Sequence, residues 1–242
     1  MDRPNILIVN DDGVEAEGLR MLAENAARIG DVWVVAPDRQ CSAMSQRITI
    51  FDPLPIRRVD FPVAVKGAWS VGGTPADCVK AALNHLLPVR PDLLFSGINH
   101  GFNTGFDIAY SGTIGAAMEG LMKGVPSYAF SMSMGGSFAL VERELFPVMQ
   151  QVLSLPREPG SIWNVNFPGV EPENCRGVLW DRSIAPMQLY LDRYAFEKQA
   201  DGSLLMINRS VPAAAELAPE GSDVHAVLNG YISVGRLRCA VL

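Results

Sequence analysis

The sequence predicts an α/β fold in which a Rossmann-like, mostly parallel sheet is flanked by helices and carries a β-rich extension or arm. Short apolar runs alternate with segments of helical periodicity over about residues 1–170. Polar loops follow these runs, as at the carboxyl ends of parallel strands. Beyond that point, short β-branched pieces and turns replace the alternation. We expect a single domain over residues 1–242, with an α/β core over 1–170 and a β-rich extension with closing strands over 171–242.

The composition excludes several classes of protein. The 242 residues are 48% hydrophobic and 19% charged, which excludes disorder. No apolar run approaches the ~20 residues of a membrane helix, so we expect no membrane association. The formal net charge of -6 argues against general nucleic-acid binding. The four cysteines form no C-x-x-C pair, which favours free thiols in a reducing cytoplasm.

The first predicted strand, Ile6 to Val9, leads to two adjacent carboxylates, Asp11 and Asp12, and then to Gly13. Four consecutive apolar residues suit a strand buried on both faces. Side chains alternate along a strand, so the carboxylates converge only if the backbone turns, which glycine permits. Two carboxylates about 4 Å apart repel by roughly 4 kcal/mol at an effective dielectric of about 20, so we expect a cation between them. The alternative is that one acid caps the next helix while the other faces water.

The next segments continue the alternation. Residues 19–27 have helical spacing, Gly30 ends that helix, and residues 32–36 form a second buried strand. No G-x-G-x-x-G motif follows the first strand, which disfavours a dinucleotide cofactor. The polar stretch 37–46 is a loop at the carboxyl end of the second strand. It therefore lies on the same sheet edge as the two acids.

An insertion and a third strand follow. Residues 48–72 predict a hairpin or extra strands, because proline and glycine break up short β-branched pieces. Thr74 is a good N-cap for a helix that extends to about His85. Residues 91–96 form the third buried strand, which leads into a glycine- and asparagine-rich loop over 97–107.

A helix of small residues begins at Ser111–Thr113 and stops at Gly124. Free N–H groups at its start, beside two hydroxyls, suit a phosphate group. Residues 125–131 and 161–167 predict further strands, with a helix over 138–153 between them.

The chain after Pro168 predicts an arm and closing strands. An Asp201-Gly202 turn lies within the arm. The predicted segments are 177–184, 187–197 and 203–209 as strands or an extended arm, and 224–228 and 231–237 as closing strands.

Four oxygen-bearing side chains meet at one edge of this predicted sheet: Asp11, Asp12, Ser42 and Asn99. Each follows a predicted parallel strand, and ligands bind at that edge. Taken singly, each is an ordinary cap, turn or loop residue. Together, two carboxylates, an amide oxygen and a hydroxyl suit one Mg²⁺ or Mn²⁺ ion, and the helix start at Ser111–Thr113 suits a phosphoryl group beside that ion.

Three other classes compete with this interpretation. A response-regulator receiver also begins with a strand ending in paired acids, but it needs an aspartate after its third strand, where this chain has Gly97 and Asn99. A haloacid-dehalogenase-like phosphatase needs D-x-D, whereas this chain has Asn10-Asp11-Asp12. A metal-binding protein without catalytic activity stays open.

Several blocks of the sequence, in order, resemble the SurE family, the stationary-phase survival proteins that act as metal-dependent 5′-nucleotidases. The blocks are 10–13, 36–39 with Ser42, 73–79, 96–105 and 110–120, followed by 164–168 and Gly221-x-Asp223. The resemblance covers nearly the whole chain. It implies a Rossmann-like domain whose β-rich extension and C-terminal segment exchange between the subunits of a homodimer, with pairing into a tetramer left open.

The resemblance also implies roles for individual residues. The implied metal ligands are Asp11, Asp12, Ser42 and Asn99, and the implied phosphate-binding residues are Asn103, Ser111, Gly112 and Thr113. The expected reaction removes the 5′-phosphate from a nucleoside monophosphate, using water activated by the ion, with Asp11, Asp12 and Asn103 as catalytic residues. One aspartate acts as general base or as nucleophile, and the sequence leaves both roles open.

Four positions depart from the usual pattern of the family: Gln40, Cys41, Ala43 and His100. His100 and Cys41 motivate a second hypothesis. In it the protein acts on another phosphomonoester or a short polyphosphate, or binds nucleotide and metal without hydrolysis.

Overall fold

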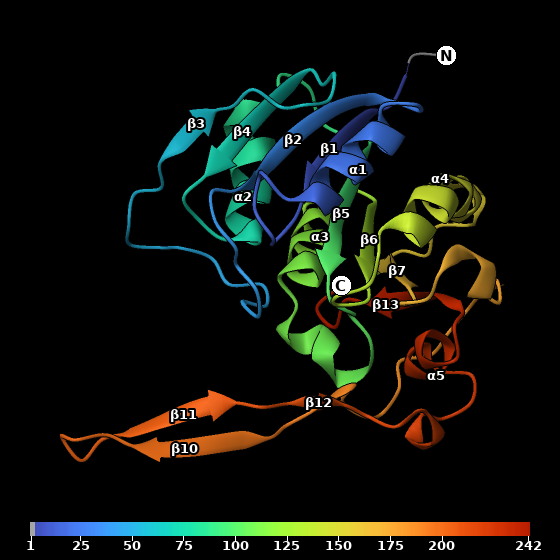
Figure 1. Cartoon of the computed structure of the whole chain (residues 1–242). Helices are drawn as coiled ribbons and strands as arrows, with labels where there is room; N and C mark the ends of the chain where they lie inside the picture. Colours follow the sequence, from blue (N-terminus) through green and yellow to red (C-terminus); the bar gives the residue numbers. More distant parts are fainter. Residues whose placement is uncertain (1–2) are drawn as a thin grey trace.

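The computed structural model describes residues 3–242 and is built on a nine-stranded sheet of order β3-β4-β2-β1-β5-β6-β7-β13-β8 (Figure 1). The run from β4 to β7 is parallel, whereas β3 and β13 are antiparallel to β4 and β7. The strands are β1 Asn5–Val9, β2 Asp31–Pro37, β3 Ile56–Arg58, β4 Gly67–Val71, β5 Leu93–His100, β6 Ser127–Met132, β7 Ser161–Phe167, β8 Val178–Leu179 and β13 Ile232–Arg238. This architecture confirms the predicted fold class.

Helices cover both faces of the sheet, with α1 and α4 on one face and α2 and α3 on the other (Figure 1). The helices are α1 Glu17–Ala26, α2 Pro75–Ala81, α3 Gly112–Met122, α4 Ala139–Ser154 and α5 Asp223–Leu228. No helix among residues 3–242 is long and apolar enough to cross a membrane.

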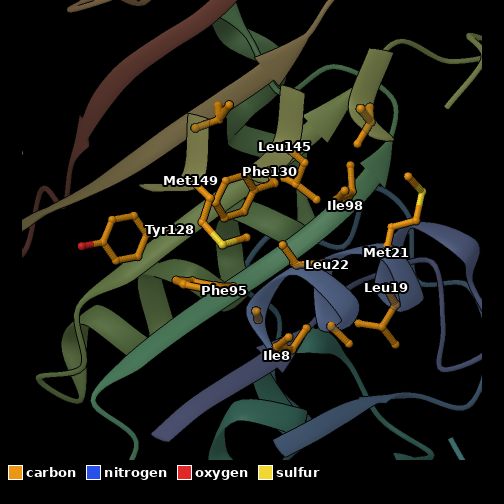
Figure 2. Packing of buried hydrophobic residues seen from close by; sticks show 14 of the residues in the cluster. Ile8, Leu19, Met21, Leu22, Phe95, Ile98, Tyr128, Phe130, Leu145 and Met149 are labelled. Carbon is orange, nitrogen blue, oxygen red and sulfur yellow. The ribbon is translucent and has the colours of Figure 1, made fainter. Parts of the chain in front are cut away.

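Figure 2 shows the core on the α1 and α4 face, where Ile8, Phe95 and Phe130 extend from the central strands toward Leu22 and Leu145 of the helices. All five side chains are buried. A second buried cluster lies on the α2 and α3 face. Burial of each large apolar side chain contributes roughly 1.5–3 kcal/mol, so both faces of the central strands contribute to stability. Burial on both faces explains why strands such as β1 appear as uninterrupted apolar runs in the sequence.

β5 is longer than predicted. It continues to His100, so the prediction that the loop begins at Gly97 is wrong. The strand passes an irregularity between Ser96 and Asn99 and then pairs again with β6, with Asn99 opposite Ser131. Pairing with β6 keeps this glycine-containing segment of β5 in the sheet.

The predicted closing strand over 224–228 is also wrong, because these residues form α5. The Ser222 hydroxyl accepts a hydrogen bond from the His225 N–H at 3.2 Å and caps the helix. The α-helix capped by Thr74 ends at Ala81, and a π-helix over Ala82–Leu86 follows it directly. The predicted insertion supplies β4, which is a parallel member of the main sheet.

The segment beyond residue 170 does two things. It returns β8 and β13 to the main sheet, where β13 pairs with β7. It also forms an arm that projects from the rest of the molecule (Figure 1). The arm consists of β9 Tyr190–Leu191 paired with β12 Val211–Pro212, and β10 Tyr194–Lys198 paired with β11 Leu204–Asn208.

Candidate active site

The site begins at the turn after β1. The Asn10 amide brackets this turn: its Nδ2 donates to the Gly13 carbonyl at 2.8 Å, and its Oδ1 accepts from the Gly13 N–H at 3.3 Å. Gly13 has a φ of 103°, a left-handed conformation that favours glycine. In the sheet, β2 and β4 lie on one side of β1, whereas β5, β6 and β7 lie on the other. The turn after β1 is therefore at the point where the strand order reverses. Open α/β sheets bind ligands at such points.

Asp11 is buried and is held by Thr113 from the start of α3. The Thr113 hydroxyl donates to Oδ1 at 2.6 Å, and the Thr113 N–H donates to Oδ2 at 3.2 Å. Burial, together with the neighbouring charge of Asp12, raises the pKa of Asp11 to about 6, although the two hydrogen bonds from Thr113 act to lower it. The ionised carboxylate of Asp11 is therefore destabilised in this site, and a cation bound beside it would stabilise it.

Asp12 is half-buried and lies against the end of β5. Its Oδ2 accepts a hydrogen bond from the His100 N–H at 3.0 Å. Asn99, the preceding residue, donates through Nδ2 to the Gly101 carbonyl at 2.7 Å. This bond orients the amide so that its oxygen is left to act as a ligand.

Ser42 lies in the loop after β2, beside the same turn. The N–H of Cys41, its neighbour, donates to the Asp11 carbonyl at 2.7 Å. Further along this loop, the Ser45 hydroxyl donates to the Ala109 carbonyl at 2.8 Å. Ser42 itself is exposed, and within residues 3–242 its hydroxyl makes no hydrogen bond. The loop is therefore fixed on both sides of a hydroxyl that is available to a ligand.

The donor set fits a divalent cation. Asp11 and Asp12 contribute two negative charges, and no lysine, arginine or histidine within residues 3–242 forms an ion pair with either. Asn99 and Ser42 supply neutral oxygens beside them. Hard cations such as Mg²⁺ and Mn²⁺ prefer oxygen ligands of this kind. The described residues hold no cluster of three or more His, Cys, Asp or Glu side chains suited to a metal, so this site depends on neutral oxygens.

Asn103 is buried at the edge of the site and is held by β6 and β7. Its N–H donates to Asn166 Oδ1 and its side-chain Nδ2 donates to Ser131 Oγ, at 2.8 and 2.7 Å. Its carbonyl accepts from the Asn164 and Asn166 amides at 2.8 and 3.2 Å. These two β7 asparagines are functional candidates that the sequence patterns did not predict. Their signal was two amides, two positions apart, in an otherwise apolar strand, which places both on one face.

The start of α3 completes the site. The Ser111 hydroxyl caps the helix by accepting from the Ile114 N–H at 3.1 Å, which leaves its own hydrogen to donate elsewhere. A Cβ on Gly112 would lie 2.9 Å from the Asp11 Cβ and 3.0 Å from its Oδ2, so this position requires glycine. Both Thr113 donors face Asp11. The contacts therefore bring the start of α3, the end of β5 and the loop before Ser42 to the turn that carries Asp11 and Asp12, with Thr113 supporting a carboxylate.

A cavity of about 910 Å³ opens beside this constellation. It is lined by Ala43, Phe102, Asp107, Tyr110, Ser133, Met134, Gln188, Leu189, Tyr190, Asp192, Tyr194, Asn208, Ser210, Pro212 and Leu228. Three lining residues, Ala43, Phe102 and Tyr110, adjoin Ser42, Asn103 and Ser111 in sequence. None of the predicted site residues lines the cavity itself, which runs beside the loops that carry them and reaches the base of the arm at Tyr190 and Pro212.

Comparisons with known proteins identify the family. The family described as "Survival protein SurE" matches residues 6–187. A 5′-nucleotidase SurE from Trichormus variabilis is 40% identical over 96% of this chain and 92% of its own, and one from Protochlamydia amoebophila is 45% identical over 73% and 68%. The crystal structure of the SurE protein from Aquifex aeolicus superposes with a TM-score of 0.81 at 36% identity, covering 97% of this chain and 93% of its own. On this match of sequence and fold, the chain belongs to the SurE family.

Proposed function

We propose that this protein is a divalent-metal-dependent phosphate monoester hydrolase that removes the 5′-phosphate from nucleoside monophosphates. The observation that carries the proposal is the pair of carboxylates, Asp11 and Asp12, beside the start of α3, which have no cationic partner among residues 3–242. Relatives named 5′-nucleotidase SurE, 34–45% identical to this chain, support it.

One Mg²⁺ or Mn²⁺ ion would be held by Asp11, Asp12, Ser42 and Asn99. When bound, such an ion neutralises phosphate charge and makes water more acidic. Thr113 holds Asp11 in one orientation, and the His100 N–H does the same for Asp12. Partners that orient metal ligands commonly change metal affinity by 10- to 100-fold when they are removed, so these contacts belong to the proposed site.

The phosphate group would lie at the start of α3. Ser111 and the Gly112 N–H are the donors there, and the helix dipole favours negative charge at this end. Asn103 has a second amide hydrogen beyond the one given to Ser131 and would bind another phosphate oxygen. Thr113 would affect phosphate binding indirectly, because both of its donors hold Asp11 and Asp11 would hold the ion.

Asp12 is the better candidate to accept a proton from the attacking water. Both oxygens of Asp11 already accept hydrogen bonds from Thr113, whereas Asp12 uses only Oδ2, toward His100. Asp12 is also the more accessible of the two. Its Oδ1 is therefore available to a proton or to the ion.

The cavity favours a nucleoside over a second phosphate. Among the described residues that line it are four aromatic rings and two carboxylates, and neither lysine nor arginine. The aromatic residues are Phe102, Tyr110, Tyr190 and Tyr194. Uncharged rings can stack on such side chains, whereas a polyphosphate tail would meet the charges of Asp107 and Asp192. This contrast favours nucleoside monophosphates over short polyphosphates.

A phosphatase screen tests the proposal. Purified protein is incubated with nucleoside 5′-monophosphates, other phosphomonoesters and short polyphosphate, each with Mg²⁺, Mn²⁺ or a chelator. We expect phosphate release that needs the ion and is abolished by Asp12→Asn, while Asp38→Asn, at another acid after β2, retains it. Full activity in Asp12→Asn, or activity in chelator, would overturn the proposal. Nucleotide-induced thermal stabilisation without phosphate release would support the second hypothesis of binding alone.

We also propose a homodimer in which the arm packs on a second copy. The arm projects from the molecule and exposes Phe196 and Met206, a cross-strand pair that is 62% and 61% exposed. Leu204 and Leu205 are more than half exposed beside them. Apolar surface gathered on a projecting hairpin typically marks a contact with another chain. Tetramer formation, the absence of nucleic-acid binding and a cytoplasmic location stay predictions.

A further inference from the structure

His100 connects the active site to the loop after β6, residues 133–138. Its ring Nε2 accepts a hydrogen bond from the Gly135 N–H at 3.2 Å. Its ring also stacks on Phe138, with centroids 5.9 Å apart and planes inclined by 26°. A single side chain therefore contacts this loop at its middle and at its end.

The same loop forms a wall of the cavity. Ser133 and Met134 both line it, and the Met134 side chain is 64% exposed. The Ser133 N–H donates to the Phe167 carbonyl at 3.1 Å, which fixes the beginning of the loop to β7. Beyond Met134, the Gly135 N–H donates to the His100 ring, and the Gly136 N–H donates back to the Ser133 carbonyl at 3.3 Å. The His100 ring therefore attaches the turn that carries Met134 to the end of β5.

The main chain and the side chain of His100 serve different parts of the site. The His100 N–H donates to Asp12, and every substitution except proline retains that donor. The ring instead contacts Gly135 and Phe138. Substitution at this position therefore changes the loop while the contact to Asp12 is preserved.

We propose that His100 is a positioning residue for substrate specificity: its ring holds the 133–138 loop so that Met134 closes the cavity over the nucleoside part of the substrate. This inference rests on the proposed function for its substrate. The nucleoside lies in the cavity, whereas the phosphate lies at the start of α3. Loss of the ring should therefore weaken recognition of the base and leave recognition of the phosphate intact.

A matched pair of substrates tests this separation. A nucleoside 5′-monophosphate and ribose 5-phosphate share the phosphate and the sugar and differ in the base. For His100→Ala, we expect KM for the nucleotide to rise about fivefold to tenfold, the effect of one hydrogen bond and one ring contact, with kcat and the KM for ribose 5-phosphate changed by less than about twofold. His100→Gln places an amide oxygen near the position of Nε2 and should restore most of the nucleotide KM. His85→Ala, at an exposed histidine on the π-helix, is the control.

Two further measurements do not depend on hydrolysis. Hydrogen exchange of residues 133–138 should accelerate in His100→Ala and not in His85→Ala, and Mn²⁺ affinity should stay within about twofold of the parent because the N–H to Asp12 remains. Equal losses for nucleotide and ribose 5-phosphate, or unchanged exchange of the loop, would overturn the inference. If the parent protein releases no phosphate, the proposed function fails, and the loop exchange with equilibrium binding of the two ligands still decides the role of His100.

Discussion

Thr113 binds both carboxylate oxygens of Asp11, through its hydroxyl at 2.6 Å and its N–H at 3.2 Å. This contact joins the first residue of the proposed metal site to the helix that would bind the phosphate. A substitution of either Thr113 or Asp11 should therefore change the binding of both the metal ion and the phosphate.

Thr113→Val should lower the affinity for the divalent ion by about 10- to 100-fold, because valine preserves the shape and the N–H but removes the hydroxyl that orients Asp11. Calorimetric titration with Mn²⁺ measures the change. Thr113→Ser restores a hydroxyl and serves as the control. Equal affinity in Val and Ser variants would show that the hydroxyl has no part in holding the carboxylate.

The stability of the metal-free protein should fall as the pH rises from about 4 to about 6. Burial raises the folded pKa of Asp11 from 3.8 to about 6, so the folded protein binds this proton more tightly than the unfolded chain does. That stabilisation is complete below the unfolded pKa and is lost as the pH rises through the folded pKa. The shift corresponds to roughly 3 kcal/mol in the free energy of unfolding.

Urea unfolding across this pH range measures the effect. Asp11→Asn should flatten the profile, and the difference between parent and variant isolates Asp11 from other buried acids such as Asp223, whose pKa burial also raises. Saturating Mg²⁺ should remove the loss at neutral pH, because the ion favours the charged carboxylate. A parent profile that matches the Asp11→Asn profile would refute the assignment.

Removal of the divalent ion should lower the thermal midpoint, and restoring it should raise the midpoint with concentration. An ion present at 100 times its dissociation constant stabilises the folded state by about 2.7 kcal/mol. Asp12→Asn should lose most of this response, whereas Asp38→Asn should keep it. Scanning calorimetry with and without chelator makes the comparison. An equal response in Asp12→Asn and parent would place the ion elsewhere.

Replacement of Phe196 and Met206 by aspartate should convert the proposed dimer to a monomer, because two charges would enter the apolar face of the arm. Light scattering after size-exclusion chromatography gives the mass. Glu197→Gln, on the opposite face of the same strand, leaves the apolar pair intact and is the matched control. A dimer of unchanged mass and affinity in the double variant would exclude the arm from the interface.

Much of the fold was predictable from the sequence because strands buried on both faces favour apolar residues, and β1, β2 and the first half of β5 contain uninterrupted apolar runs. The carboxyl ends of these strands share one edge, which placed Asp11, Ser42 and Asn99 together. The closing segment was misjudged because Val224 and Val227 favour strands in isolation, whereas the Ser222 cap starts a helix there. A cap of this kind is a local side-chain bond that apolar patterning does not contain.

The contacts that orient the site were less predictable. The bond between Thr113 and Asp11 spans 102 positions and depends on how closely α3 packs against β1, which Gly112 permits. The support of Asn103 by Asn166 depends on the pairing of strands from distant parts of the chain. Sequence patterns predict which residues reach the edge, while hydrogen-bond partners follow only from packed helices and strands.

β13, near the end of the sequence, lies beside β7 in the main sheet and covers the strand whose amides hold Asn103. Asp223, just before it, accepts a hydrogen bond from the Gly105 N–H at 2.9 Å and fixes the turn after Asn103. On the ribosome, a nascent chain that has already made every proposed metal ligand therefore still has β7 as an open edge. Catalytic competence would be acquired only after the segment from Asp223 through β13 has emerged, which separates synthesis of the site from its activation.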